Sequence, residues 1–418
     1  MASAYSVLTH EAIIDSVWQE SIKPLLLKRY PNSTDDDLMK ARSYAYGGSL
    51  MEDMGYYPFG SKLFSDLIHY VRTGEFIEVM IQESQDLNEY AFALGALSHY
   101  RSDSTGHAIA TNHAVPLLWP KLRKKYGNLV TYDEKPSAHI RAEFGFDVLQ
   151  VARGDYLPEA YHDFIGFQIS KSLLARVFPN VYSLELKDVL KNFDTAAVTF
   201  RYSVRDLIPE LTKAAWGLKK DEIVQLQPAM TKTKFRYLMP RADFEKEWGT
   251  EYKRPGFFTR MLTFFIRIIP KIGPFKALAV KLPTPEAEKL FLDSYAATVT
   301  EYVELLRDVR HHSLELKNRN LDTGRITELG EYNRADKTYA KLLEKLAERN
   351  FEHVTPELKT HILNFFNDSN ALQFAFKDED DREQVLEHLH TLESTQISEI
   401  PSDAKTEFYF DTSVFYRH

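Results

Sequence analysis

Apolar residues recur along most of this chain at the spacing of an amphipathic α-helix. One stretch carries Leu87, Tyr90, Ala91, Leu94 and Leu97. Residues spaced by three and four positions lie on one face of a helix, so a helix is predicted here, ending or bending near Gly106. The apolar/polar alternation typical of strands is rare elsewhere in the chain. The pattern therefore predicts an all-α fold.

Cap residues and helix breakers divide the first half of the chain. Helix starts are predicted at Thr9 and at Ser33 or Thr34, the latter with acids in the first turn. A break is expected at Gly47-Gly48, and an aromatic-rich loop over 53–60. Further helices are expected over 64–71, 76–106, 112–126, 136–153 and 158–175, and between 185 and 218. Residues 1–218 are expected to form one helical domain.

The remainder, 219–418, is predicted to be a mainly helical extension whose role the sequence leaves open. Residues 252–282 are basic and apolar without acids. Such a segment is either an amphipathic helix packed on the first domain or a contact with an anionic membrane surface. Two Thr-Pro-Glu sequences, at 284–286 and 355–357, predict helix starts. The chain beyond 377 is rich in acids and is expected to be solvated.

The amino-acid composition limits the kinds of partner and metal site that the chain can have. The chain has 418 residues, 44% of them hydrophobic, and a formal net charge of −8. This balance argues against a bulk nucleic-acid binder, so no stable nucleic-acid partner is expected. The absence of cysteine excludes disulfides and thiolate metal sites, so any zinc would be held by His, Asp, Glu and backbone groups. No apolar run is long enough for a spanning helix.

His99, Asp103 and His107 stand at positions i, i+4 and i+8 of the helix predicted over 76–106. Their side chains would lie on a single face, where they form either an ordinary polar surface or a zinc-type site. His139 and Glu143 repeat the His-x3-acid spacing on a second predicted helix. Two such pairs favour the metal site.

Together with three further histidines or acids upstream, these residues form one constellation. It comprises His10, Asp53, His69, His99, Asp103, His107, His139 and Glu143. Zinc usually takes four ligands, so eight candidates suit two or three ions.

The order His, Asp, His, His-x3-Asp, His, His-x3-Glu resembles the trinuclear zinc phosphoesterases, which include bacterial zinc-dependent phospholipase C and the P1/S1-type nucleases. The resemblance covers roughly residues 5–145. It implies three zinc ions. The first would be held by Asp53, His69, His99 and Asp103, with Asp103 bridging to an ion that His10 also binds. The third would be held by His107, His139 and Glu143.

The same family uses its mature N-terminal residue as a ligand through the free amine and backbone carbonyl. In the nuclease branch that residue stands five positions before the first His, which is Tyr5 here. Ala2-Ser3-Ala4 directly before it looks like a signal-peptidase site. The resemblance therefore implies an exported protein, secreted or periplasmic, cut before Tyr5. The short step from Asp103 to His107, and Tyr in place of Trp, depart from the family pattern.

The resemblance implies a phosphodiester hydrolase, and phospholipase C-type cleavage of a phospholipid head group by metal-activated water is the first hypothesis. Asp53 would bind metal and also orient or deprotonate the water. The aromatic residues Tyr56, Tyr57 and Phe59 would hold a choline by cation–π contact, or else pack within their loop. Peripheral membrane contact through 252–282 would accompany this activity.

Two alternatives remain. A single-strand nuclease or 3′-nucleotidase is supported by the Tyr5-to-His10 spacing, and would need aromatic residues near the metals for base stacking. A zinc-stabilised lipid-surface binding module without catalysis is disfavoured, because structural zinc sites are normally single and closed.

Overall fold

The computed structural model describes residues 5–153, 167–226, 281 and 283–396. No strand occurs in these ranges, where an isolated bridge pairs Arg319 with Ile326, so the predicted all-α fold is confirmed. The helices are α1 (Val7–Val17), α2 (Lys23–Arg29), α3 (Asp35–Met51), α4 (Lys62–Tyr70), α5 (Thr73–Gln82), α6 (Leu87–Gly106), α7 (Asn112–Leu118), α8 (Pro120–Tyr126), α9 (Pro136–Arg153), α11 (Lys171–Tyr182), α12 (Leu186–Val189), α13 (Phe193–Leu226), α17 (Pro285–His311), α18 (Asn333–Ala347), α19 (Pro356–Phe365), α20 (Ser369–Ala375) and α21 (Glu379–Ser394). Short helical turns of other pitch are the π-helical η1 (Trp18–Ile22) and η3 (His107–Thr111) and the 3-10 turn η2 (Glu52–Tyr56).

Several helix starts follow the predicted cap chemistry. The Thr34 hydroxyl accepts the amide of Asp37, whose carboxylate accepts the Thr34 amide in return. The side chains of Thr284 and Thr355 accept the amides of Ala287 and Leu358 at the starts of α17 and α19, and each threonine is followed by proline. Thr9 is not a cap. Helix α1 begins at Val7, and the Thr9 hydroxyl donates to Asp147 of α9 instead.

The predicted break at Gly47-Gly48 is wrong, because α3 continues through both glycines to Met51. Their role is close packing. A Cβ at Gly47 would lie 1.6 Å from the Gln168 carbonyl oxygen, and one at Gly48 would lie 2.0 Å from that of Phe92 in α6. These glycines let other backbone segments approach α3.

Two predicted helices are each divided. The stretch 76–106 contains α5 and α6, separated where Asp86 caps α6 by accepting the amide of Glu89. The stretch 112–126 contains α7 and α8, the second with Pro120 in its first turn. Of the helix expected over 158–175, residues 158–166 lie outside the described residues, and α11 begins at Lys171.

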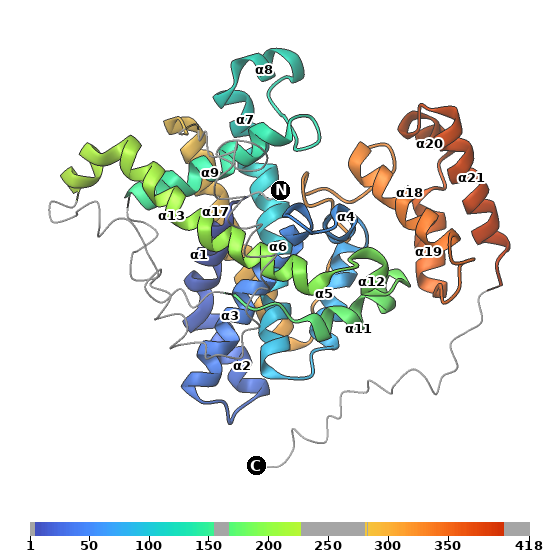
Figure 1. The fold of residues 1–418 in the computed structure, drawn as a ribbon, viewed down its shortest axis with the longest axis horizontal. Helices are drawn as coiled ribbons and strands as arrows, with labels where there is room; N and C mark the ends of the chain where they lie inside the picture. Colours follow the sequence, from blue (N-terminus) through green and yellow to red (C-terminus); the bar gives the residue numbers. More distant parts are fainter. Residues whose placement is uncertain (1–4, 154–166, 227–280, 282, 397–418) are drawn as a thin grey trace.

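Helix α6 lies at the centre of the molecule, against α3, α5 and α17 (Figure 1). The C-terminal helices α18–α21, orange to red in Figure 1, form a group at one side, where α18 packs on α4. Helix α17 also contacts α1, α7 and η3, so part of the predicted extension 219–418 lies directly on the first domain. A domain boundary at 218 stays a prediction.

The basic and apolar segment 252–282 lies, apart from residue 281, outside the described residues, so its membrane contact also stays a prediction. Within the described helices, none combines the length and apolar character needed to span a bilayer.

Candidate metal centre

The eight predicted ligands come from six helical segments that meet around the C-terminal half of α6. Each of these side chains is buried, and the largest exposed fraction, 8%, belongs to Asp53. Helix α6 contributes His99 and Asp103, α1 contributes His10, η2 Asp53, α4 His69, η3 His107, and α9 His139 and Glu143.

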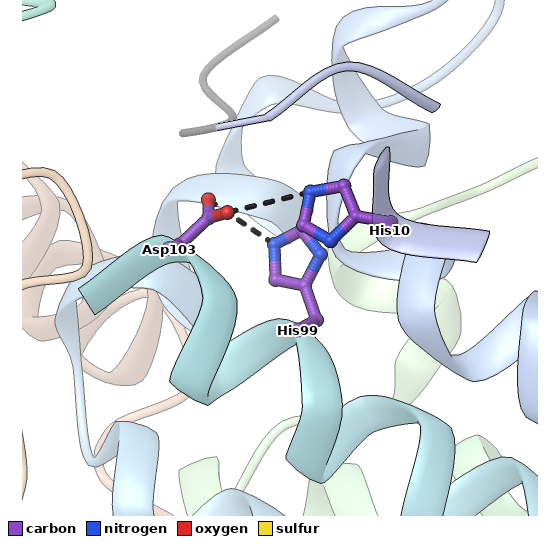
Figure 2. Close-up of side chains that lie close together, drawn as sticks. All are labelled: His10, His99 and Asp103. Atoms are coloured by element: carbon purple, nitrogen blue, oxygen red, sulfur yellow. Dashed lines mark ion pairs between the residues drawn. The ribbon is translucent and has the colours of Figure 1, made fainter. Parts of the chain in front are cut away.

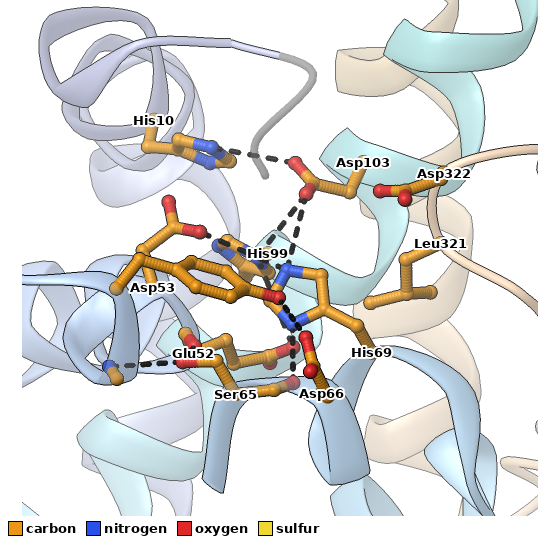
Figure 3. A network of polar contacts seen from close by, with 12 residues as sticks. His10, Glu52, Asp53, Ser65, Asp66, His69, His99, Asp103, Leu321 and Asp322 are labelled. Atoms are coloured by element: carbon orange, nitrogen blue, oxygen red, sulfur yellow. Dashed lines mark hydrogen bonds and ion pairs between the residues drawn. The ribbon is translucent and has the colours of Figure 1, made fainter. Parts of the chain in front are cut away.

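Asp103 lies between three histidines (Figures 2 and 3). Its Oδ1 is 3.4 Å from His10 Nε2, and its Oδ2 is 3.3 Å from His99 Nε2 and 3.6 Å from His69 Nε2. Ligand atoms of His10, His99 and Asp103 lie within 4.8 Å of one another, and so do those of Asp53, His69 and His99. Two potential ion sites therefore share the His99 side chain.

A third group consists of His107, His139 and Glu143. Glu143 Oε1 lies 3.8 Å from His107 Nε2 and 3.9 Å from His139 Nδ1. The step from Asp103 to His107 is one α-helical turn, because the His107 amide donates to the carbonyl oxygen of Asp103; the π-helical turn η3 follows. One turn beyond Asp103, His107 meets His139 and Glu143 of α9.

Each of four histidine rings is oriented by a backbone carbonyl. A carbonyl only accepts, so the bonded ring nitrogen carries the proton and the opposite nitrogen presents a lone pair to its group. The pairs are His69 Nδ1 with Ser65 O at 2.8 Å, His99 Nδ1 with Ser49 O at 2.8 Å, His107 Nδ1 with Leu321 O at 3.0 Å, and His139 Nε2 with Val130 O at 2.6 Å.

The donor atoms fit a metal. His107 Nε2, His139 Nδ1, Glu143 Oε1 and Asp53 Oδ1 are buried without a hydrogen-bond partner in the described part of the chain. Buried polar atoms are normally paired, and unpaired atoms that lie together, as those of His107, His139 and Glu143 do, are what a cation would satisfy. The three groups are therefore compatible with metal sites.

When no metal is bound, burial determines which of these histidines and carboxyl groups are charged. It lowers the pKa of His10 and His139 to about 3, with further lowering by the neighbouring His99 and His107 respectively. It raises the pKa of Glu143 to about 8 although His107 opposes this shift. A bound cation would supply the positive charge that lets such carboxylates ionise.

Glu52 is a site residue that the sequence analysis did not identify. It is fully buried, its Oε2 lies 3.8 Å from His99 Nε2, and burial raises the pKa of its carboxyl to about 7. Neither of its oxygens has a hydrogen-bond partner among the described residues. Its only sequence signal was its position next to Asp53.

Tyr5 lies beside His10, with ring centroids 6.1 Å apart, and is 1% exposed. Its hydroxyl donates to Ser294 of α17 at 2.7 Å. The phenol is thus used in packing on α17, and a metal contact through the Tyr5 backbone stays a prediction.

The three predicted head-group residues lie in different environments. Tyr56 is half-buried next to His69, with ring centroids 5.8 Å apart. Tyr57 is buried against Phe200, whereas Phe59 is 50% exposed. The structure therefore places Tyr56 beside the metal centre, packs Tyr57 into the core and leaves Phe59 at the surface.

Arg334 of α18 adds a cation beside Tyr56. Its guanidinium carbon lies 5.6 Å from the centroid of the Tyr56 ring and 5.0 Å from that of Tyr132. Asp66 holds both residues, because its Oδ1 accepts from Arg334 Nη2 at 3.0 Å and from the Tyr56 hydroxyl at 2.8 Å. Tyr132 in turn lies edge-on to His139. Arg334 and Tyr132 had no signal in the sequence analysis.

Comparison with known proteins agrees with this geometry. Residues 9–192 match the family model described as zinc dependent phospholipase C. No curated protein and no solved structure matches the chain. The matched residues include all eight His, Asp and Glu residues of the three groups, and exclude Tyr5 and everything from α17 onward. Over residues 9–192, the chain is therefore similar to the zinc-dependent phospholipase C family.

Proposed function

We propose that this protein is a phospholipase C-type phosphodiesterase that binds three zinc ions and releases a phosphorylated head group from a phospholipid. The observation that carries the proposal is the set of three buried His/acid groups, two of which share His99, within the matched residues. Structural zinc sites are normally single, so the joined groups favour catalysis over a binding module.

The proposed ligands are Asp53, His69, His99 and Asp103 for the first ion, Asp103 and His10 for the second, and His107, His139 and Glu143 for the third. Zinc would supply Lewis-acid stabilisation of phosphate oxygens and a lowered pKa for water. The four backbone carbonyls orient four of the histidine rings and leave the opposite ring nitrogen to face an ion.

Asp53 is the proposed residue that orients the attacking water. It has the largest exposed fraction of the eight, and its Oδ1 lies 3.7 Å from His69 Nε2. A carboxylate in this position can accept a hydrogen bond from water approaching from outside. Tyr56, which lies beside His69, is the proposed contact for the head group. The guanidinium of Arg334 lies over the Tyr56 ring, so its positive charge favours a phosphate group at this place and disfavours a further cation.

Export belongs to the same proposal. The Tyr5 ring lies beside His10, and in a chain that began with Tyr5 the free amine is the proposed additional ligand of the second ion. We expect a chain beginning at Tyr5 to retain zinc at higher chelator concentrations than the chain beginning at Met1. Equal retention would contradict a role for the amine.

The test of function compares substrates on the zinc-loaded full chain. We expect turnover of vesicles of phosphatidylcholine or phosphatidylglycerol and none of single-stranded DNA or 3′-nucleotides. His99→Ala is expected to abolish turnover, because it removes a proposed ligand of the first ion that lies next to the bridging Asp103. His311→Ala, an exposed histidine at the end of α17, is the matched control and should retain it. Turnover of the nucleic-acid substrates alone would favour the nuclease, and turnover of neither class would refute the proposal.

A further inference from the structure

The segment 313–332, which connects α17 to α18, lies outside the residues that match the family. Apart from the isolated bridge between Arg319 and Ile326, it has no regular secondary structure. Such a connection normally runs over the surface. Here Asn320, Leu321 and Asp322 are at most 1% exposed, and Figure 3 shows Leu321 and Asp322 beside the metal centre.

Leu321 contacts two of the predicted ligands through its backbone. Its carbonyl oxygen accepts a hydrogen bond from His107 Nδ1 at 3.0 Å. Its amide donates to the carbonyl oxygen of His69 at 3.1 Å. One residue of the segment thus fixes the ring of His107 and connects it to the backbone of α4.

Asp322 anchors the segment at this place. Its Oδ2 accepts hydrogen bonds from the hydroxyls of Tyr70, at 2.7 Å, and Tyr332. Its Oδ1 lies 3.9 Å from His107 Nδ1. That is the ring nitrogen opposite the one that faces Glu143, so Asp322 is a positioning residue behind His107.

Asn112 of α7 joins this anchor to the other histidine of the third group. Its side-chain amide donates to the backbone oxygen of Asp322 at 2.8 Å. The backbone carbonyl of Asn112 accepts the amide of Val130 at 2.9 Å, and the backbone carbonyl of Val130 accepts a hydrogen bond from His139 Nε2. Asn112 therefore holds both Asp322, the residue next to Leu321, and Val130, whose carbonyl orients His139.

We propose that the segment 313–332 contributes to the metal centre, because Leu321, held in place by Asp322 and Asn112, positions His107 for the third ion. The inference rests on the proposed function for the presence of that ion. Partners that orient metal-binding histidines typically contribute 10–100-fold to metal affinity. Part of the C-terminal half would then take part in metal binding, since a chain ending at 218 would lack the Leu321 carbonyl that accepts the hydrogen bond from His107.

The experiment measures zinc retained by the full chain during dialysis against increasing chelator concentrations. The test variants are Asn112→Ala, Asp322→Ala and the milder Asp322→Asn. The matched control is Tyr100→Phe, which removes a 2.7 Å hydrogen bond to the carbonyl of Lys317 in the same segment but away from the histidines. Thermal unfolding of every variant separates a loss of metal affinity from a loss of stability.

We expect Asn112→Ala and Asp322→Ala to lose one ion at about 10–100-fold lower chelator concentration, with the other ions retained. Asp322→Asn keeps one oxygen as an acceptor and should show a smaller change. Adding His107→Ala to Asn112→Ala should cause no loss of a second ion, because both act on the same site. Tyr100→Phe should retain zinc like the wild type.

Retention by Asn112→Ala and by both Asp322 variants equal to that of Tyr100→Phe would overturn the inference. So would a loss of all ions in proportion to the loss of thermal stability. Because the readout is bound zinc, a chain that binds three ions but turns over no phospholipid would refute the proposed function and leave this inference intact. A wild-type chain that binds no zinc would overturn both.

Discussion

Replacing Gly95 of α6 by alanine is expected to destabilise the fold. An ideal Cβ on Gly95 would lie 2.0 Å from the carbonyl oxygen of Ala45 in α3, and 3.0 Å from its Cα. Both atoms belong to backbone, so a flexible side chain cannot yield. Gly95→Ala must therefore push α3 and α6 apart, since ordinary contacts begin near 3.4 Å.

The energetic balance has two terms. Alanine in a helix interior gains about 1 kcal/mol over glycine. Overpacking of a well-packed interior costs about 1–3 kcal/mol, and a rigid backbone contact favours the upper end. We expect Gly95→Ala to lose about 2 kcal/mol of the free energy of unfolding. Gly217 of α13 is the matched control, because a Cβ there meets no atom of the described chain within 4 Å. Gly217→Ala should gain up to about 1 kcal/mol.

The same displacement reaches the metal centre. His99 follows Gly95 by one turn, and its Nδ1 lies 2.8 Å from the carbonyl oxygen of Ser49 in α3. A separation of the helices would stretch this bond beyond hydrogen-bond range. Gly95→Ala should therefore also release zinc at lower chelator concentration, whereas Gly217→Ala should not.

Urea unfolding of both variants in excess chelator measures the effect of packing on the free energy of unfolding without bound zinc. Chelator titration of the zinc-loaded proteins measures how tightly each variant retains zinc. If Gly95→Ala is stabilised as much as Gly217→Ala, the close approach of α3 and α6 is not what glycine is needed for. The reasoning from packing to the orientation of His99 would then be refuted.

Three further predictions use other parts of the molecule. Removal of zinc should lower the thermal unfolding temperature, since each ion present at 100 times its Kd adds about 2.7 kcal/mol; an unchanged temperature would argue against bound ions. Arg334→Gln and Asp66→Asn should show a coupling energy of about 1–2 kcal/mol in a double-mutant cycle by urea unfolding, because the pair is mostly buried and also holds Tyr56; additive effects would contradict this. Burial raises the pKa of the Asp336 carboxyl to about 6, although the amide of Gly330 opposes the shift. The folded state thus binds this proton more tightly, and the stability it contributes is lost as the pH rises through about 6. Asp336→Asn should therefore be more favourable relative to the wild type at pH 8 than at pH 5 in urea unfolding, and an equal difference at both values would contradict the assignment.

Local signals were enough for much of the fold. Helical periodicity and cap residues such as Thr34, Thr284 and Thr355 act within one turn, so sequence alone placed those helix starts. Gly47-Gly48 was misread because glycine serves both to end helices and to let helices approach. Which role applies depends on Gln168 and Phe92, far away in the chain.

The candidate ligands were also predictable, because a metal site requires particular side chains and helical spacing brings some of them together. His99 and Asp103 share a helix face, as do His139 and Glu143. The sequence could not show that His107 groups with His139 and Glu143 rather than with Asp103, or that Glu52 lies close to His99.

By itself, the sequence determined the helical class, and it predicted the candidate donor residues and the resemblance to a zinc phosphoesterase family, because each of these depends on residue type and local spacing. The tertiary structure alone decided how the donors are oriented. Every residue has a backbone carbonyl, so nothing in the sequence distinguishes Leu321 as the acceptor for His107. That contact exists only because folding brings a segment from beyond α17 against α4 and η3.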